Sequence, residues 1–174
     1  IGGEDHFAVL IGKGADLEAP LVRLHSQCIT GDVLGSLKCD CGDQLQAAMR
    51  LMAENGGGVL IYLAQEGRDI GLLNKMRAYA LQDNGLDTVD ANHALGFDTD
   101  ERVFLPAARI LDALGITRLR LITNNPDKIS QLEQCGIKVE ERVPLMLASN
   151  PHNEDYLATK KHRTGHMIAD KDKG

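Results

Sequence analysis

Hydrophobic and polar residues along the chain follow two patterns that alternate. Short β-prone runs of strand length lie at residues 6–11, 21–25, 59–63, 119–123 and 137–143. Apolar residues recur at helical spacing in the longer segments 43–55, 72–82 and 104–114. A further helix is expected from residue 126, and a polar, helix-prone tail ends the chain. The pattern therefore predicts strands that alternate with helices.

Local signals mark where several of these helices begin and end. Asp43 is a candidate N-cap, and the glycine run 56–58 ends the first long helix. Asn125 precedes Pro126, a residue favoured at the first position of a helix. Only a polar, glycine-containing stretch separates the first two strands, so we expect them to be neighbours, which disfavours a purely parallel sheet. We predict an α/β (α+β) fold with a mixed β-sheet flanked by helices, in a single domain over residues 1–174.

Composition and charge narrow the class of protein. Hydrophobic residues make up 43% and charged residues 25% of the chain, which is typical of a globular domain. The net charge of −6 disfavours a broad surface for nucleic acid or for an acidic membrane. No apolar run approaches the roughly 20 residues that span a bilayer. We expect a cytoplasmic protein without nucleic-acid or membrane partners.

Three of the four cysteines lie close together in the sequence. Cys28, Cys39 and Cys41 fall within fourteen positions, and such crowding fits a metal site better than disulfides. Thiolates favour zinc, and a zinc ion with three protein ligands keeps one position for a water whose pKa falls toward about 7. The spacing predicts one hydrolytic Zn²⁺ per chain. Alternatives are a structural zinc completed by His25, or three buried thiols; Cys135 is expected in the core.

Two other loops follow predicted strands, where α/β folds bind ligands. In residues 65–68, Gly67 permits close approach to a ligand and Arg68 suits phosphate oxygens. Residues 123–128 add a helix N-terminus and Lys128. Each loop alone is also explained as an ordinary turn or cap. The signatures of zinc-dependent nucleobase deaminases and of the P-loop are both absent from the sequence.

Long motifs in register resemble GTP cyclohydrolase II of riboflavin biosynthesis. They are VRLHSQCITGD at 22–32, KCDCG at 38–42, QEGRDIGL at 65–72, KMRAY at 75–79, DTVDAN at 87–92, LGF at 95–97 and LITNNP at 121–126. The resemblance implies zinc-dependent hydrolysis of GTP that opens the imidazole ring, a cyclic amidine. Formate and pyrophosphate leave, and 2,5-diamino-6-ribosylamino-4(3H)-pyrimidinone 5′-phosphate is formed. It also implies Mg²⁺ on the substrate phosphates and a homodimer.

The resemblance also assigns residues. The metal ligands fall on Cys28, Cys39 and Cys41, and the substrate contacts on Arg23, Leu24, His25, Ser26, Gln27, Gln44, Glu66, Gly67, Arg68, Thr88, Thr123 and Lys128. Tyr79 is the tyrosine of ring opening, and Asp100 and Arg102 take the places of a base and a nucleophile. A guanidinium stays protonated, so a clamp on phosphate suits Arg102 better than nucleophilic attack. From residue types alone, Asp100 would be a helix cap and Tyr79 a packing residue.

Two positions depart from the family pattern. Gln27 replaces a common glutamate before Cys28, and Ala64 replaces a frequent basic residue. From the resemblance, we expect an N-terminus that is shortened relative to the family. Glu66 is a candidate to read guanine, unless Arg68 pairs with it. The alternatives left open are a non-catalytic zinc-containing module that binds GTP, and a variant hydrolase that retains the formyl group.

Overall fold

The protein folds around one mixed β-sheet. The structure is a computed structural model that describes residues 5–14, 18–100, 102–145, 147 and 150–167. Five strands lie in the order β1-β3-β2-β4-β5. β1 pairs with β3 in the antiparallel direction, and the other pairs are parallel. The strands are β1 (Phe7–Gly12), β2 (Leu21–Ser26), β3 (Gly57–Leu63), β4 (Arg118–Ile122) and β5 (Lys138–Val143).

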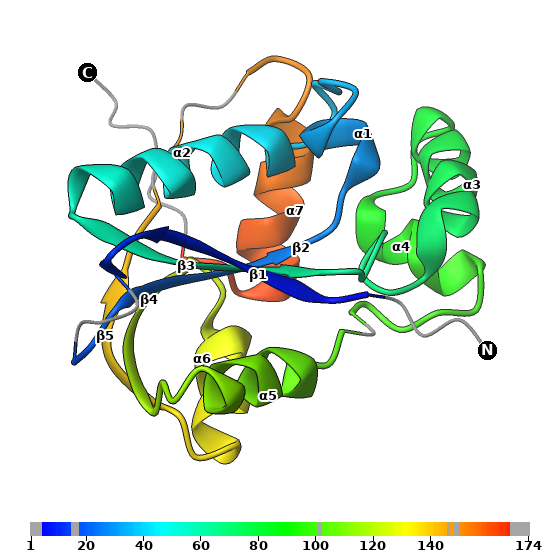
Figure 1. Ribbon diagram of the computed structural model, residues 1–174. Helices are drawn as coiled ribbons and strands as arrows, with labels where there is room; N and C mark the ends of the chain where they lie inside the picture. The colour runs from blue at the N-terminus through cyan, green and yellow to red at the C-terminus, as the bar shows by residue number, and fades with distance from the viewer. Residues whose placement is uncertain (1–4, 15–17, 101, 146, 148–149, 168–174) are drawn as a thin grey trace.

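Helices cover both faces of this sheet, which confirms the predicted α/β class (Figure 1). The helices are α1 (Ile29–Asp32), α2 (Cys41–Glu54), α3 (Gly71–Asp83), α4 (Thr88–Ala94), α5 (Leu105–Ala113), α6 (Pro126–Gln134) and α7 (Glu154–Thr164). In Figure 1, α2 runs along one face, α5 and α6 lie on the other, and α3 and α4 stand together beyond one end. In the described part of the chain, no helix has the length and apolar character that a membrane span requires.

The main core lies between the sheet and α5 and α6. Val22, Leu24, Ile61 and Leu121 contribute strand side chains that are inaccessible to solvent, and Phe104 closes the cluster before α5. Central parallel strands with helices on both faces are buried on both sides, so their residues form nearly continuous apolar runs. A second cluster, around Met52, packs α2 on the opposite face.

The predicted adjacency of the first two strands is wrong. β3 lies between β1 and β2, because α2 carries the chain from β2 into the parallel strand β3 and β1 then pairs with the free edge of β3. The glycine run at 56–58 makes this pairing possible. A Cβ atom on Gly57 would lie 2.1 Å from the carbonyl oxygen of Ile11. These glycines therefore serve strand contact as well as ending the helix.

Three local expectations also need correction. Helix α2 begins at Cys41 with Asp40 at its N-cap position, so Asp43 lies inside the first turn. Asp100 and Arg102 precede α5, whose N-cap is Phe104, so neither residue caps that helix. Cys135 is exposed at the end of α6 rather than buried in the core. The short helix α4 was not predicted, because its seven residues hold few apolar positions.

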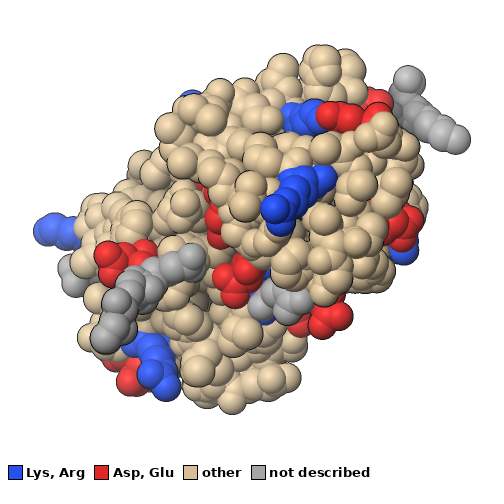
Figure 2. Space-filling view, turned by 90° about the vertical axis from the view of Figure 1, so that its right-hand side faces the viewer, with Lys and Arg blue, Asp and Glu red and all other residues tan. Residues whose placement is uncertain are grey.

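Charged side chains are dispersed on the face shown in Figure 2, which is the side that carries α3 and α4. Basic and acidic residues there are interspersed rather than gathered into one stripe. A nucleic-acid surface needs a concentrated basic patch to neutralise phosphates. Among the residues that the structure describes, no such concentrated basic patch is seen on this face.

Candidate active site

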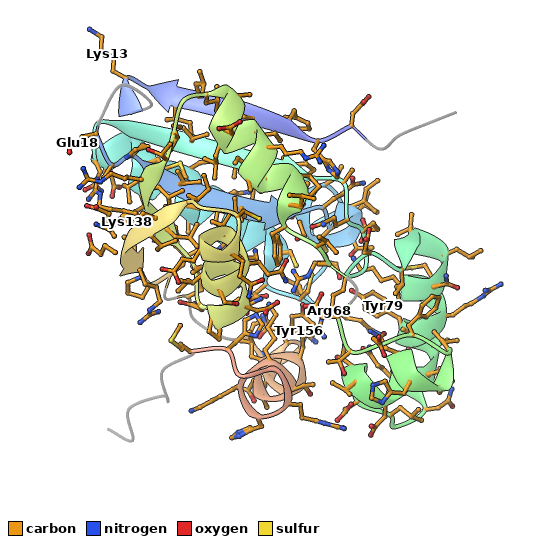
Figure 3. The ribbon with its side chains drawn as sticks, turned by 90° about the horizontal axis from the view of Figure 1, so that it is seen from below. Lys13, Glu18, Arg68, Tyr79, Lys138 and Tyr156 are labelled. Carbon is orange, nitrogen blue, oxygen red and sulfur yellow. The ribbon has the colours of Figure 1, made fainter. Side chains whose placement is uncertain are left out.

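A pocket opens where the parallel strands β2, β3 and β4 end. These carboxyl ends lie at one edge of the sheet, the usual ligand-binding edge of α/β folds. The empty space, open mouth included, is about 1040 Å³. Figure 3 shows Arg68, Tyr79 and Tyr156 gathered at this end, whereas Lys13, Glu18 and Lys138 mark the opposite end.

The pocket contains the three cysteines that the sequence predicts as metal ligands. The Sγ atoms of Cys28, Cys39 and Cys41 all lie within 4.8 Å of one another, and Cys28 and Cys39 are 3.6 Å apart. Gly31 packs directly beneath them, because a Cβ atom there would lie 2.9 Å from Sγ of Cys39. In the described part of the chain, no histidine or carboxylate joins this group. The donor set fits one zinc ion with a position left for another ligand.

Lys75 places a positive charge against the thiol cluster. Its Nζ atom donates to Sγ of Cys28 at 3.0 Å, to Oγ1 of Thr30 at 2.9 Å and to Oε1 of Glu66 at 2.8 Å. Hydrogen bonds with the neighbouring thiols lower the pKa of the Cys28 thiol most, and the hydrogen bond with Lys75 lowers it further. The pocket therefore favours a thiolate at this position, as metal binding requires.

Asp32 fixes the backbone that carries Cys28. Its carboxylate accepts hydrogen bonds from the Cys28 amide at 3.0 Å and from the Tyr62 hydroxyl at 2.8 Å. It also lies 3.0 Å from Nε2 of His25. Burial lowers the pKa of His25, so the ring is neutral and Nε2 carries the proton that it donates to Asp32. His25 therefore belongs to this support and not to the thiol group.

The loop after β3 holds Glu66 and Arg68 in different environments. The Glu66 carboxylate accepts from Lys75 and from the Ile29 amide at 2.7 Å, so it is committed within the protein. Arg68 donates to the carbonyl oxygen of Thr99 and does not pair with Glu66. Arg68 and Asp69 both have positive φ, at 60° and 76°, a conformation that costs energy for residues other than glycine. Such strain is typical of functional loops. In this loop, Gly67 and Arg68 line the pocket.

Arg102 and Asp100 form a bidentate ion pair on another wall. Nε of Arg102 lies 2.7 Å from Oδ1 and NH2 lies 2.5 Å from Oδ2 of Asp100. Burial alone would lower the pKa of Arg102, but the bonds to Asp100 hold it above its ordinary value. The same pairing outweighs burial and lowers the pKa of Asp100. Both groups are therefore charged at neutral pH.

Arg23 and Lys128 lie deeper in the pocket. Arg23 donates to the Ile122 carbonyl at 3.0 Å and to Oε1 of Gln44 at 2.5 Å, and burial lowers its pKa to about 10. Lys128 donates to the Leu24 carbonyl at 2.8 Å. Burial, together with the charges of Arg23 and Arg102, pushes the pKa of Lys128 well below its ordinary value. An anion in the pocket would relieve this crowding of positive charge.

Tyr79 faces the thiol cluster from α3. Its ring lies 5.2 Å from Nζ of Lys38 and 5.8 Å from Nζ of Lys75. Burial raises the pKa of Tyr79 to about 12, so the phenol keeps its proton at neutral pH. A protonated phenol beside the metal ligands can act as a hydrogen-bond donor or proton donor.

Most residues assigned from the sequence line this one pocket. They are the ligands Cys28, Cys39 and Cys41, together with Arg23, His25, Ser26, Gln27, Gln44, Gly67, Arg68, Tyr79, Thr88, Arg102, Thr123 and Lys128. Three others lie behind the wall. The Leu24 side chain is in the core, the Glu66 carboxylate binds Lys75, and Asp100 contributes through Arg102. Their proposed roles remain predictions.

Comparison with known proteins agrees with this arrangement. The family model for GTP cyclohydrolase II matches residues 1–144. The chain belongs to the GTP cyclohydrolase II family. This membership confirms the resemblance drawn from the sequence motifs and makes the chain a hydrolase of that family.

Proteins named GTP cyclohydrolase-2 are similar over most of the chain. The protein from Cronobacter sakazakii is 54% identical over 167 residues, which are 96% of this chain and 85% of that protein. The protein from Escherichia coli K12 is 54% identical over 166 residues, which are 95% of this chain and 85% of that protein. The protein from Azospirillum brasilense is 58% identical over 167 residues, and this chain spans only 43% of its length.

Sequence reasoning missed several pocket residues, among them Lys75, Tyr156 and Lys160. Lys75 stands in a family motif, but its charge was not connected with the thiols. Tyr156 and Lys160 lie four positions apart in the polar tail, a spacing that places both on one face of a helix. That spacing was the signal in the sequence that could have identified the two residues. Both lie beyond residue 144, where the match to the family model ends.

Proposed function

We propose that this protein hydrolyses GTP, opening the guanine imidazole ring with loss of formate and pyrophosphate. The product is 2,5-diamino-6-ribosylamino-4(3H)-pyrimidinone 5′-phosphate, and the reaction is the first step of riboflavin biosynthesis. One observation carries the proposal. A single pocket brings three metal-ligating thiols together with the basic side chains of Arg23, Arg68, Arg102 and Lys128. The relatives named GTP cyclohydrolase-2 support the same substrate.

The metal proposed for this pocket is one zinc ion on Cys28, Cys39 and Cys41. Zinc with three protein ligands would supply an activated water for hydrolysis at neutral pH. Lys75 and Asp32 would keep Cys28 in position through the bonds to its Sγ atom and its amide. Mg²⁺ would come with the triphosphate, since it binds phosphate oxygens and retains water ligands.

Tyr79 would serve the ring-opening half of the reaction. Its phenol is protonated at neutral pH and lines the pocket together with the thiols. It can donate to the imidazole nitrogen that is released as the ring opens. In this proposal, the proton that the released nitrogen takes up comes from the Tyr79 phenol.

Arg102 would serve the phosphate half as a clamp. Because Asp100 keeps its pKa high, the guanidinium holds its protons and has no free lone pair for attack on phosphorus. Its fork of N–H donors can instead stabilise charge that develops on the α-phosphate as pyrophosphate leaves. Asp100 would fix the orientation of that fork.

The decisive experiment measures formate and pyrophosphate released from GTP by zinc-loaded protein, by metal-stripped protein and by the Cys39→Ser variant. We expect both products from the first sample and no formate from the other two. Tight GTP binding without turnover would identify a non-catalytic module. A product whose mass includes one extra formyl group would identify the formyl-retaining hydrolase. Absence of formate from zinc-loaded protein contradicts the proposal.

A further inference from the structure

The last described helix, α7, forms part of the pocket wall. Tyr156, Lys160 and His166 all line the pocket, although the family match ends at residue 144. In Figure 1, α7 is the orange helix that lies behind the sheet, close to the start of α2. Helix α7 lies outside the residues that the family model matches, and its contacts tie it to the pocket.

Side-chain bonds hold α7 against two different walls. Nζ of Lys160 lies 2.6 Å from Oδ1 of Asp40, the residue between two of the cysteines. Arg163 pairs with Asp87, and with Asp90 at 3.0 Å, at the start of α4. Just beyond the helix, the amide of Met167 donates to the Asn124 carbonyl at 2.8 Å. These contacts fix both the height and the rotation of α7 over the pocket.

Tyr156 contacts Lys160 and lines the pocket together with Arg68 and Arg102. Nζ of Lys160 is 4.5 Å from the centre of the Tyr156 ring. Arg102 and Arg68 are close enough that their charges act on the Tyr156 hydroxyl. Figure 3 shows Tyr156 reaching from α7 toward Arg68. Burial raises the pKa of Tyr156, so its hydroxyl remains a donor at neutral pH.

The ammonium of Lys160 is already used by the protein. It pairs with Asp40, which also accepts from Nε2 of Gln44 at 2.5 Å. A lysine held in this way can fix the plane of an aromatic ring above which it sits. Lys160 is therefore better suited to hold Tyr156 in place than to bind a phosphate itself.

We propose that Tyr156 donates a hydrogen bond to the α-phosphate of the bound nucleotide, and that Lys160 is the positioning residue that aims it. The inference rests on the proposed function, which places Arg102 on that phosphate. Tyr156, Arg102 and Arg68 line the same pocket, and Nζ of Lys160 sits over the Tyr156 ring at 4.5 Å. Because the proposed function has Arg102 clamp the α-phosphate, that phosphate is the one Tyr156 would reach.

The test uses Tyr156→Phe, which removes only the hydroxyl. Dissociation constants are measured for guanosine, GMP and the α,β-methylene analogue of GTP, which cannot release pyrophosphate. We expect about tenfold weaker binding of GMP and of the analogue, and less than about twofold change for guanosine. Equal loss for guanosine, or no loss for GMP, would overturn the contact with the α-phosphate.

A double-mutant cycle tests the positioning role of Lys160. In the Lys160→Met background, Tyr156→Phe should weaken GMP binding by less than about twofold, since the ring is no longer aimed. Lys160→Arg should restore most of the tenfold effect. Full additivity of the two substitutions would show that Lys160 acts elsewhere. His162→Ala, on the exposed face of the same helix, is the control and should leave all three constants unchanged.

Failure of this inference can be separated from failure of the proposed function. Binding of GMP needs no turnover, so the Tyr156 and Lys160 measurements hold whether or not wild-type protein releases formate. If formate is released normally and Tyr156→Phe binds GMP like wild type, only the role of α7 is wrong. If wild-type protein binds none of the three ligands, the substrate proposal itself is wrong.

Discussion

The Nζ atom of Lys75 lies 3.0 Å from the Sγ atom of Cys28, with the carboxylate of Glu66 2.8 Å from the same nitrogen. A cation is thus shared between a thiol of the candidate metal site and a buried acid. Three thiolates and one zinc ion would carry a net negative charge, and the buried ammonium of Lys75 would offset it. The Glu66 carboxylate, a candidate from the sequence to read guanine, pairs with the same ammonium, and its role toward guanine stays a prediction.

Lys75→Met should destabilise the zinc-loaded protein, because it leaves Glu66 as an unpaired buried carboxylate. The side chains of Lys75 and Glu66 are only 11% and 9% exposed, so a loss of about 3 kcal/mol in the free energy of unfolding is expected. The double variant Lys75→Met/Glu66→Gln should recover part of this loss. Urea unfolding at saturating zinc measures it, and equal stabilities of single and double variants would contradict the charge-balance argument.

Gly31→Ala should empty the metal site without touching a ligand. The added methyl would lie 2.9 Å from Sγ of Cys39 and 3.3 Å from Sγ of Cys28, so the thiols must move apart. We expect zinc content, measured by elemental analysis after gel filtration, to fall well below one ion per chain. Leu34→Ala, at a residue 73% exposed in the following turn, is the matched control and should keep its zinc. Full zinc occupancy in Gly31→Ala would show that the thiols can adjust.

Elements with strong local signals were predictable from the sequence. Asn125 and Pro126 predicted the start of a helix, and α6 begins at Pro126. The Asn125 side chain accepts a hydrogen bond from the Asp127 amide, as an N-cap does. The partner of β1 was not predictable, because it depends on where the crossover through α2 places β3. Local spacing cannot show which strand edge the rest of the fold leaves open.

The same limit applies to the site. Motif residues such as Cys28 and Arg68 could be assigned because each lies in a contiguous pattern. The contact of Lys75 with Cys28 joins residues 47 positions apart, and that of Lys160 with Asp40 joins residues 120 apart. Such pairs are created by tertiary packing of separate helices. A single sequence shows that each residue is present, but it does not show which residues pair.

Arg102→Ala should reduce pyrophosphate release from GTP by about 100-fold, the usual loss when one preorganised donor is removed from developing charge. Arg102→Lys keeps the charge but loses the fork that Asp100 orients, so it should recover only part of the rate. Release is measured by a coupled phosphate assay at saturating GTP. Arg77→Ala, on the exposed face of α3, serves as the control. A normal rate in Arg102→Ala would rule out the clamp.

Lys128→Met should stabilise the free protein most at low pH. Burial lowers the pKa of Lys128 in the fold from an ordinary value of 10.5. Between the folded and unfolded pKa values, the unfolded chain binds more protons, so wild-type stability rises with pH across that window. Below the folded pKa, the full cost of the buried charge is present, and the variant without that charge gains most.

The measurement for Lys128 is the free energy of urea unfolding of wild type and Lys128→Met from pH 6 to pH 10, without ligand. The advantage of the variant should shrink steadily as the pH rises, because wild type then loses the proton that burial penalises. Lys138→Met, at a side chain 68% exposed at the far end of the sheet, is the control and should show no such trend. A difference between wild type and Lys128→Met that stays constant over this range would mean that Lys128 keeps its ordinary protonation in the fold. Its proposed place on a substrate phosphate would then need no proton to be taken up on binding.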